Sequence, residues 1–194
     1  MYKRQVRNYP AAFFIQTTDI DMTAATAEGG LFYHEGAGWE PIREFDGNYN
    51  GSGCRIIGLT SKQEWYSGFV EENSGIIRNL GMEQGTVTSE NSHIGGFVGY
   101  NQGIIENCYN TSTVTDLNIK TTPPNYAGGI AGENSLHGII KNCYNRGTIS
   151  GNAPGGIVGR NWSGTIENCR NMGTVTSVHL LAGGIAGDNG GLIT

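Results

Sequence analysis

Residues 128–151 read Gly-Gly-Ile-Ala-Gly-Glu-Asn-Ser-Leu-His-Gly-Ile-Ile-Lys-Asn-Cys-Tyr-Asn-Arg-Gly-Thr-Ile-Ser-Gly. This stretch holds three short apolar pieces, at residues 128–132, 138–143 and 147–150, and each of them opens on glycine. Similar pieces recur on both sides of it. The equivalent glycines are 28, 33, 27 and 28 residues apart, and they are Gly68, Gly96, Gly129, Gly156 and Gly184. The chain is therefore an internal repeat of 27–28 residues, and the one long interval holds an insertion at residues 116–126.

A repeat of this length is typical of solenoids and propellers, but a propeller blade needs four strands in roughly 40 residues. Three short strands in 27–28 residues fit one coil of a parallel β-solenoid. One coil cannot bury its apolar face alone, so neighbouring coils stack about 4.8 Å apart and share a core. We therefore predict an all-β parallel solenoid with three strands per coil and about four full coils. The residues expected to stack inside are Val87, Val114, Ile149 and Val175 in one ladder and Ile77, Ile105, Ile140 and Ile166 in another.

Two outward positions support this register. The residue after the second isoleucine alternates in charge along the stack, as Arg78, Glu106, Lys141 and Glu167. Opposite charges side by side on adjacent strands contribute about 0.2–1 kcal/mol each. The next position is always asparagine, namely Asn79, Asn107, Asn142 and Asn168. Stacked asparagine side chains can hydrogen-bond along such a ladder.

The composition excludes several classes of protein. Glycine makes up 32 of the 194 residues without the every-third spacing of collagen, and there are only 5 prolines. Each glycine inside a helix costs ~1 kcal/mol relative to alanine, so long helices are excluded. The formal net charge is −5 without a basic stripe, which argues against a nucleic-acid partner. The longest strongly apolar run, residues 11–15, is too short for a membrane span or a signal peptide.

The repeat residues resemble the GLUG-type repeats of bacterial surface proteins, which also accompany some IgA-specific metallopeptidases. The match covers about residues 68–194. The resemblance implies a right-handed β-helix in a secreted or cell-surface protein. It carries over no catalytic residue, because none belongs to the repeat. The metallopeptidase zinc motif His-Glu-x-x-His is absent, since no second histidine follows His34-Glu35 at the needed spacing.

Three regions are expected. Residues 1–12 form an N-terminal tail whose first five residues read as an artefactual start. Residues 13–65 form a β-rich lead-in that caps the first coil, and residues 66–194 form the solenoid repeats. A solenoid needs a terminal cap with a polar outer face, and the repeat runs unfinished to Thr194. We therefore expect a C-terminally truncated fragment whose remaining parts belong to a longer parent chain.

The cysteines and two acidic segments have structural and functional interpretations. Cys108, Cys143 and Cys169 share one repeat position with Leu80, which favours a buried ladder over one disulfide or a zinc site. Residues 46–51 resemble the opening of a calcium loop without its final glutamate, or a hairpin turn. The acidic pair at residues 71–72 favours a solvated corner over glycoside cleavage. No cluster of acidic and basic residues on one sheet is recognisable, so we expect no enzyme and no cofactor.

Aromatic and hydroxyl side chains give the candidate binding surfaces. Tyr109 and Tyr144 share one outward repeat position, and Arg170 holds that position in the next copy. Trp162 lies at a different position. A strip of such aromatic side chains could stack on sugar rings. Threonine or serine pairs flank the inward valine or isoleucine, as at Thr86 and Thr88, and resemble ice-binding faces. They also suit ordinary exposed strands. The insertion at residues 116–126 is a further candidate contact loop.

These observations predict a non-enzymatic structural or adhesive segment of a secreted or cell-surface bacterial protein. Its expected partners are glycans or host or cell-surface proteins, bound by a rigid rod. The alternative is a carbohydrate-binding or carbohydrate-degrading β-helix. A cleft that holds several carboxylates would favour the enzyme, a featureless polar surface would favour the rod, and the ice-binding face is a third possibility.

Overall fold

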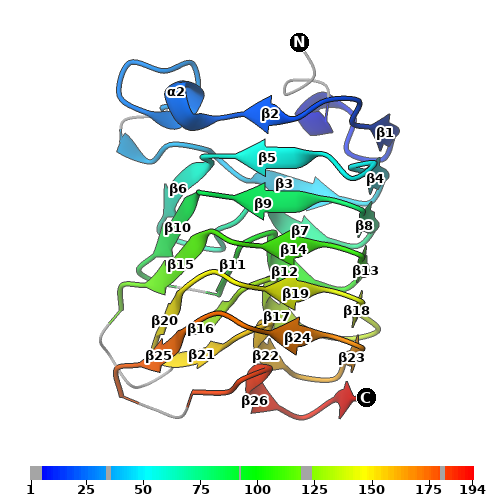
Figure 1. Cartoon of the computed structure of the whole chain (residues 1–194), viewed down its shortest axis with the longest axis vertical. Coiled ribbons are helices and arrows are strands. Elements are labelled where there is room, and N and C mark those ends of the chain that lie inside the picture. The colour runs from blue at the N-terminus through cyan, green and yellow to red at the C-terminus, as the bar shows by residue number, and fades with distance from the viewer. Residues whose placement is uncertain (1–5, 34–35, 92, 119–123, 180–181) are drawn as a thin grey trace.

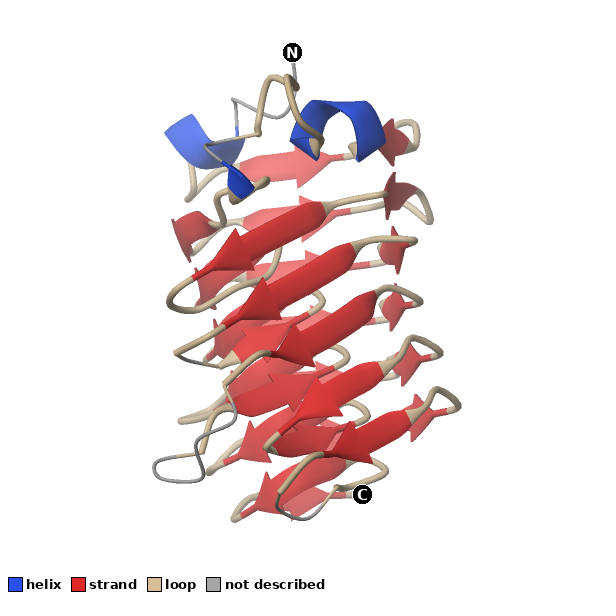
Figure 2. Ribbon diagram, turned by 90° about the vertical axis from the view of Figure 1, so that its left-hand side faces the viewer, coloured by secondary structure: helices blue, strands red, loops and turns tan. Residues whose placement is uncertain are grey.

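Short parallel strands, stacked in coils about one long axis, make up almost the whole protein (Figure 1). The computed structural model describes residues 6–33, 36–91, 93–118, 124–179 and 182–194. The first and last described segments of the chain lie at opposite ends of the stack (Figure 2). A one-turn helix, α2 (Thr23–Thr26), lies at the N-terminal end. The fold is a β-solenoid of about five turns, which confirms the predicted class.

In the described part of the chain, five parallel sheets run along the rod, and each takes one strand from successive coils. The longest sheet is ordered β1 (Phe13–Ile15), β4 (Asn48–Asn50), β8 (Ile76–Arg78), β13 (Ile104–Glu106), β18 (Ile139–Lys141), β23 (Thr165–Glu167) and β27 (Leu192–Ile193). A second is ordered β2 (Ile20–Asp21), β5 (Arg55–Ile57), β9 (Gly81–Glu83), β14 (Tyr109–Asn110), β19 (Tyr144–Asn145) and β24 (Arg170–Asn171).

The other three sheets complete each coil. One is ordered β6 (Thr60–Gln63), β10 (Thr86–Ser89), β15 (Thr113–Asp116), β20 (Ile149–Gly151) and β25 (Val175–Ser177). Another is ordered β3 (Ile42–Phe45), β7 (Val70–Asn73), β12 (Val98–Asn101), β17 (Ala131–Asn134), β22 (Val158–Asn161) and β26 (Ala186–Asn189). The shortest is ordered β11 (Ile94–Gly95), β16 (Tyr126–Gly128) and β21 (Ala153–Gly155).

The expected count of three strands per coil is too low. The coil that begins at residue 98 contains five strands, β12 to β16. Asn107 takes a left-handed backbone conformation (φ 54°) and turns the chain between β13 and β14. An additional strand thereby follows the second apolar piece of the repeat. Residues 96–97 separate β11 from β12, and neither of them takes a left-handed conformation.

The predicted inward ladders are confirmed. Val87 pairs with Val114, which pairs with Ile149, and Ile77, Ile105, Ile140 and Ile166 pair in register. All of these side chains are at most 1% exposed. Val175 continues the first ladder but is half-buried, because it lies in the last strand of its sheet. The core is therefore one continuous column of branched aliphatic side chains.

The N-terminal segment continues this stacking upward. Four strands, β3 to β6, pair in register with the coil below, as at Ile42 with Val70 and Tyr49 with Ile77. Strands β1 and β2 add part of another coil. Trp39 and Met22 are almost completely buried at this end. Among the described residues, no helix has the length and apolar character needed to cross a membrane.

Candidate binding surface

The sheet that contains β14 and β19 displays most of the predicted binding residues in one row. Tyr109 pairs with Tyr144, and Tyr144 pairs with Arg170. The two tyrosine rings are stacked, with centroids 5.0 Å apart and planes 4° from parallel. The row continues upward to Gly81 and Arg55. Three of the four predicted residues therefore form one outward ladder.

The absence of a side chain at Gly81 lets the Tyr109 ring pack directly over the backbone of β9. A Cβ at Gly81 would come within 2.4 Å of the Tyr109 ring, so any larger residue would displace that ring. The Tyr109 hydroxyl donates a hydrogen bond of 2.6 Å to Glu83, which also pairs with Arg55 at 3.2 Å. Desolvation raises the pKa of Tyr109, and the bond to Glu83 raises it further. The ring is thus a fixed, uncharged aromatic surface.

A hollow of about 310 Å³ lies beside the Tyr109 ring, and amide side chains line it. Asn79 donates from Nδ2 to Oδ1 of Asn50 at 3.0 Å, and Asn107 donates to Asn79 at 3.2 Å. These bonds confirm the upper part of the predicted asparagine ladder. Asn142 and Asn168 hold the same position and the same left-handed conformation in the next two coils. The hollow combines an aromatic wall with amide donors and acceptors.

The lower end of this row is cationic. Arg146 and Arg170 place their guanidinium carbons 5.4 Å and 5.5 Å from the centroid of the Tyr144 ring. Both arginines are exposed. We name the surface formed by Asn79, Asn107, Tyr109, Tyr144, Arg146 and Arg170 the tyrosine row.

Trp162 does not belong to the tyrosine row. It follows β22 in a different sheet, where it is 55% exposed, and Arg160 lies 3.8 Å above its ring. The insertion at residues 116–126 lies partly outside the described residues, so its predicted role as a contact loop stays a prediction. Its Asp116 is buried and accepts a hydrogen bond from Asn125 at 3.0 Å.

The sheet from β3 to β26 carries a charged cluster that the sequence interpretation missed. His93 Nε2 lies 3.1 Å from Glu133, Arg160 lies 3.8 Å from the same carboxylate, and Arg160 also reaches Asp188 at 3.4 Å. The expectation that no sheet gathers acidic and basic residues is therefore wrong. The signal was the residue before each repeat asparagine, which is Glu72, Tyr100, Glu133, Arg160 and Asp188 in successive coils.

A groove of about 790 Å³ lies at the N-terminal end of the same sheet. Its lining includes four carboxylates, the two arginines Arg7 and Arg43, and the 63% exposed ring of Trp65. The carboxylates belong to Glu40, Glu44, Glu64 and Glu71. Burial raises the pKa of Glu71 above its ordinary value, against the lowering effect of Arg43. The surface is therefore not featureless, and the groove holds several carboxylates.

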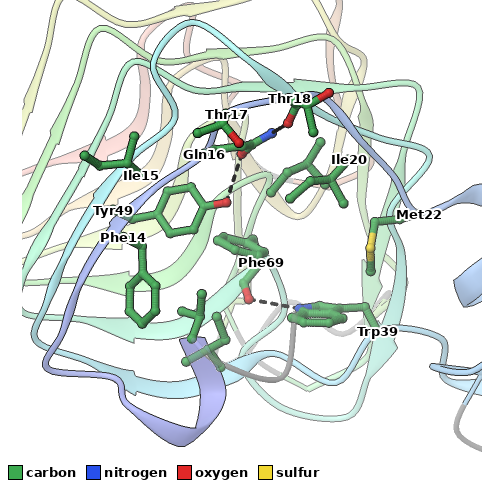
Figure 3. Close-up of a pocket in the computed structure, with 13 residues that line it drawn as sticks. Phe14, Ile15, Gln16, Thr17, Thr18, Ile20, Met22, Trp39, Tyr49 and Phe69 are labelled. Atoms are coloured by element: carbon green, nitrogen blue, oxygen red, sulfur yellow. Dashed lines mark hydrogen bonds between the residues drawn. The ribbon is translucent and has the colours of Figure 1, made fainter. Parts of the chain in front are cut away.

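The interior of the N-terminal end contains a small cavity of about 60 Å³ (Figure 3). Its walls are mostly apolar, from residues such as Phe14, Ile20 and Trp39. Its polar groups are already paired, because Tyr49 donates to Gln16 at 2.9 Å and the Trp39 indole donates to the carbonyl of Phe69 at 2.9 Å. Burial raises the pKa of Tyr49. The cavity is a gap in the packing of the end coil, with no reactive group directed into it.

The cysteine ladder lies behind the tyrosine row. Cys108 and Cys143 are at most 1% exposed, Cys169 is half-buried, and all four cysteines of the chain are free thiols. The predicted buried position is thus found for Cys108 and Cys143 and only in part for Cys169. Burial raises the pKa of Cys143, so its thiol stays protonated. Among the described residues, no group of three or more histidine, cysteine or acidic side chains is arranged to hold a metal ion. The predicted calcium segment at residues 46–51 forms the turn into β4 and that strand.

The family model of the GLUG motif matches residues 90–115, 124–150 and 150–176. Each of these three segments is similar to one GLUG motif. One position of the tyrosine row recurs in all three segments, as Tyr109 in the first, Tyr144 in the second and Arg170 in the third. The stacking seen beyond these GLUG motifs shows that unmatched residues 42–89 follow the same coil geometry.

A solved structure resembles the GLUG-motif solenoid over almost its whole length. It is the crystal structure of "a putative immunoglobulin A1 protease from Bacteroides ovatus", with a TM-score of 0.78 and 27% sequence identity. The similarity covers 98% of this chain and 61% of the other. The present chain thus corresponds to about three fifths of that protein. No curated protein matches the sequence.

Proposed function

We propose that this GLUG-motif solenoid is a non-enzymatic structural and adhesive segment of a secreted or cell-surface bacterial protein. It acts as a rigid rod, and the tyrosine row is the surface that it presents to glycans. The observation that carries the proposal is the in-register stacking of outward residues over successive coils, which places Tyr109, Tyr144 and Arg170 in one fixed row. Aromatic faces beside amides are suited to sugar rings, because the ring face packs on the aromatic group and the hydroxyls pair with the amides.

The rod and its contact surface are tested together by an adhesion assay. Beads coated with the purified chain are applied to a surface coated with mucin glycans, and the force needed to detach them is measured. We expect specific attachment that Tyr144→Ala abolishes. Tyr9→Ala is the matched control, because Tyr9 is 66% exposed and lies far from the row in the sequence. Equal attachment of both variants, or no attachment of the original chain, would reject the proposal.

A second candidate function is carbohydrate cleavage in the groove near Trp65. The specific observation in its favour is that four carboxylates line one groove and that burial raises the pKa of one of them, Glu71. A raised carboxyl pKa is what a general acid needs near neutral pH. The test is release of reducing sugar from soluble polysaccharides by the chain and by Glu71→Gln. Activity that Glu71→Gln removes would support the enzyme, and absence of activity would leave the adhesive rod.

A further inference from the structure

We propose that the ligand of the tyrosine row is an acidic oligosaccharide, whose sugar ring stacks on the tyrosines and whose anionic group pairs with Arg146 and Arg170. This inference rests on the proposed function and adds the charge of the ligand. Three observations support it. Most cationic side chains of the described residues are paired with acidic side chains of the same protein, two of the unpaired arginines gather at one place, and amide groups line the hollow in the same row.

Most cationic side chains of the described residues already have an acidic partner. For example, Arg55 pairs with Asp19 and Glu83, and Lys141 pairs with Glu106 at 2.9 Å. The cations in such pairs are Arg7, Arg55, Lys62, Arg78, Lys141 and Arg160. Within the described part of the chain, the arginines without an ion pair are Arg43, Arg146 and Arg170. Two of these three meet on one ring, that of Tyr144.

This concentration of positive charge stands out in a chain with a formal net charge of −5. The same ladder position shows the contrast directly. At its upper end, Arg55 is neutralised by two carboxylates, whereas at its lower end Arg170 is exposed and has no carboxylate partner among the described residues. Guanidinium groups bind carboxylates and sulfates through paired hydrogen bonds. Two of them held against one aromatic ring form a preorganised anion site.

The rest of the row indicates that the anion is carried by a sugar. Tyr109 and Tyr144 form a parallel aromatic pair, and the hollow beside Tyr109 is lined by the amides of Asn79 and Asn107. Amide side chains can donate and accept hydrogen bonds with the hydroxyl groups of a sugar ring. An acidic peptide lacks such hydroxyl groups along most of its length. The row runs along the rod axis over successive coils, so it suits an extended chain of several sugars with the acidic one near Arg170.

The test is calorimetric titration of the full chain with four probes of similar length. They are tetragalacturonic acid, a chondroitin sulfate tetrasaccharide, neutral cellotetraose and a hexaglutamate peptide. We expect at least one acidic tetrasaccharide to bind at least tenfold more tightly than cellotetraose. Tighter binding of the chondroitin sulfate probe, which carries both uronate and sulfate groups, than of tetragalacturonic acid would show that sulfate adds to the affinity. Binding should weaken with added salt, because exposed charges are screened.

Variants assign the binding to the row. Arg170→Gln and Arg146→Gln should each raise the Kd for the preferred acidic probe about tenfold. Lys62→Gln removes an exposed charge from β6, on a different sheet, and should leave that Kd within twofold. Equal loss in all three variants would show a general charge effect and overturn the inference.

The outcomes separate the inference from the proposed function. Equal affinity for cellotetraose and the acidic probes, with Tyr144→Ala still abolishing bead adhesion, overturns the acidic ligand and leaves the adhesive surface in place. Hexaglutamate binding as tight as that of the acidic sugars overturns the sugar assignment. Absence of binding by every probe, together with absence of bead adhesion, overturns both proposals.

Discussion

Asparagine side chains form ladders both inside and outside this solenoid, and the same residue type serves a different physical purpose in the two places. Inside, a short row joins Asn110, Asn145 and Asn171, and a longer row is called the inner ladder. The inner ladder consists of Asn73, Asn101, Asn134, Asn161 and Asn189, and all but the last are at most 1% exposed. Each donates from Nδ2 to Oδ1 of the next, at 2.7 to 3.0 Å. The outer ladder consists of Asn79, Asn107, Asn142 and Asn168, and their φ angles lie between 49° and 54°.

The difference shows that periodic asparagine has two separate causes. Inside, the amide is kept because buried polar groups must be paired, and a fully connected network is strong in a low-dielectric interior. Outside, asparagine is kept because it tolerates the left-handed conformation that ends one strand and starts the next. Hydrogen bonds between outer amides, such as that from Asn107 to Asn79, are an addition to this conformational role.

The largest effect is expected from breaking the inner ladder at its centre. Asn134 accepts a hydrogen bond from Asn101 and donates to Asn161 and to the carbonyl of Gly138. Asn134→Ala leaves several buried polar atoms unpaired at about 1–3 kcal/mol each. We expect the free energy of unfolding, measured in urea, to fall by about 3 kcal/mol or more. A loss below that of the outer variants described next would mean that the inner network does not govern stability.

The outer ladder should respond to backbone conformation and not to the amide. Asn142 has φ 53°. Valine in a left-handed conformation costs about 1–2 kcal/mol, whereas glycine adopts it freely. We therefore expect Asn142→Val to lower the free energy of unfolding by about that amount and Asn142→Gly to change it little. If both variants lost the same stability, the amide itself would be the important feature of the outer ladder.

The first member of the inner ladder sharpens the comparison. Asn73 lies below Phe45 in register, and its Oδ1 is buried without a hydrogen-bond donor. Asn73→Ala removes this unpaired atom together with the donor to Asn101, so part of the loss is offset. We expect a loss of about 1 kcal/mol, well below that of Asn134→Ala. Urea unfolding of the two variants side by side measures the difference, and equal losses would contradict it.

Much of the fold could be predicted from the sequence because the repeat fixes its own register. Equal spacing placed Val87 beside Val114 and Glu106 beside Lys141 without any knowledge of the turns. The number of strands per coil was predicted wrongly, because it depends on the left-handed turn at Asn107. The sequence pattern of a periodic asparagine is the same whether the residue forms an amide ladder or a left-handed turn, so the pattern alone does not distinguish the two roles.

The tyrosine row was predictable for the same reason, since Tyr109 and Tyr144 hold one repeat position. Its other parts depend on contacts between residues at different repeat positions. Arg146 reaches Tyr144 from two residues further along the chain, and the cluster around Glu133 joins His93 to a residue of the next coil. Repeat alignment compares only equivalent positions, so it does not show such diagonal contacts.

The smallest effect is expected above the end of the outer ladder, where an ion pair replaces the asparagine contacts. Asn50 accepts the last amide bond, and the part-coil above is tied by Asp19, which accepts from the backbone N–H and Nε of Arg55 at 2.8 and 3.0 Å. These bonds lower the pKa of Asp19 below its ordinary value of 3.8. A carboxyl group with a lowered folded pKa contributes stability above the unfolded pKa and loses it as the pH falls through the folded value.

Asp19→Asn should therefore be slightly less stable than the original chain at pH 7, and the gap should close as the pH falls below about 4. The effect is small because both side chains are partly exposed and solvent screens the pair. Urea midpoints of both proteins at pH 7, 4 and 3 measure the gap. Glu90→Gln, which removes a partner from the more exposed pair with Lys62 at 3.9 Å, is the control and should show a smaller gap at pH 7. A gap that widens on acidification would mean that Asp19 is stabilised in its protonated form, and the outer ladder would then end without an ionic contact.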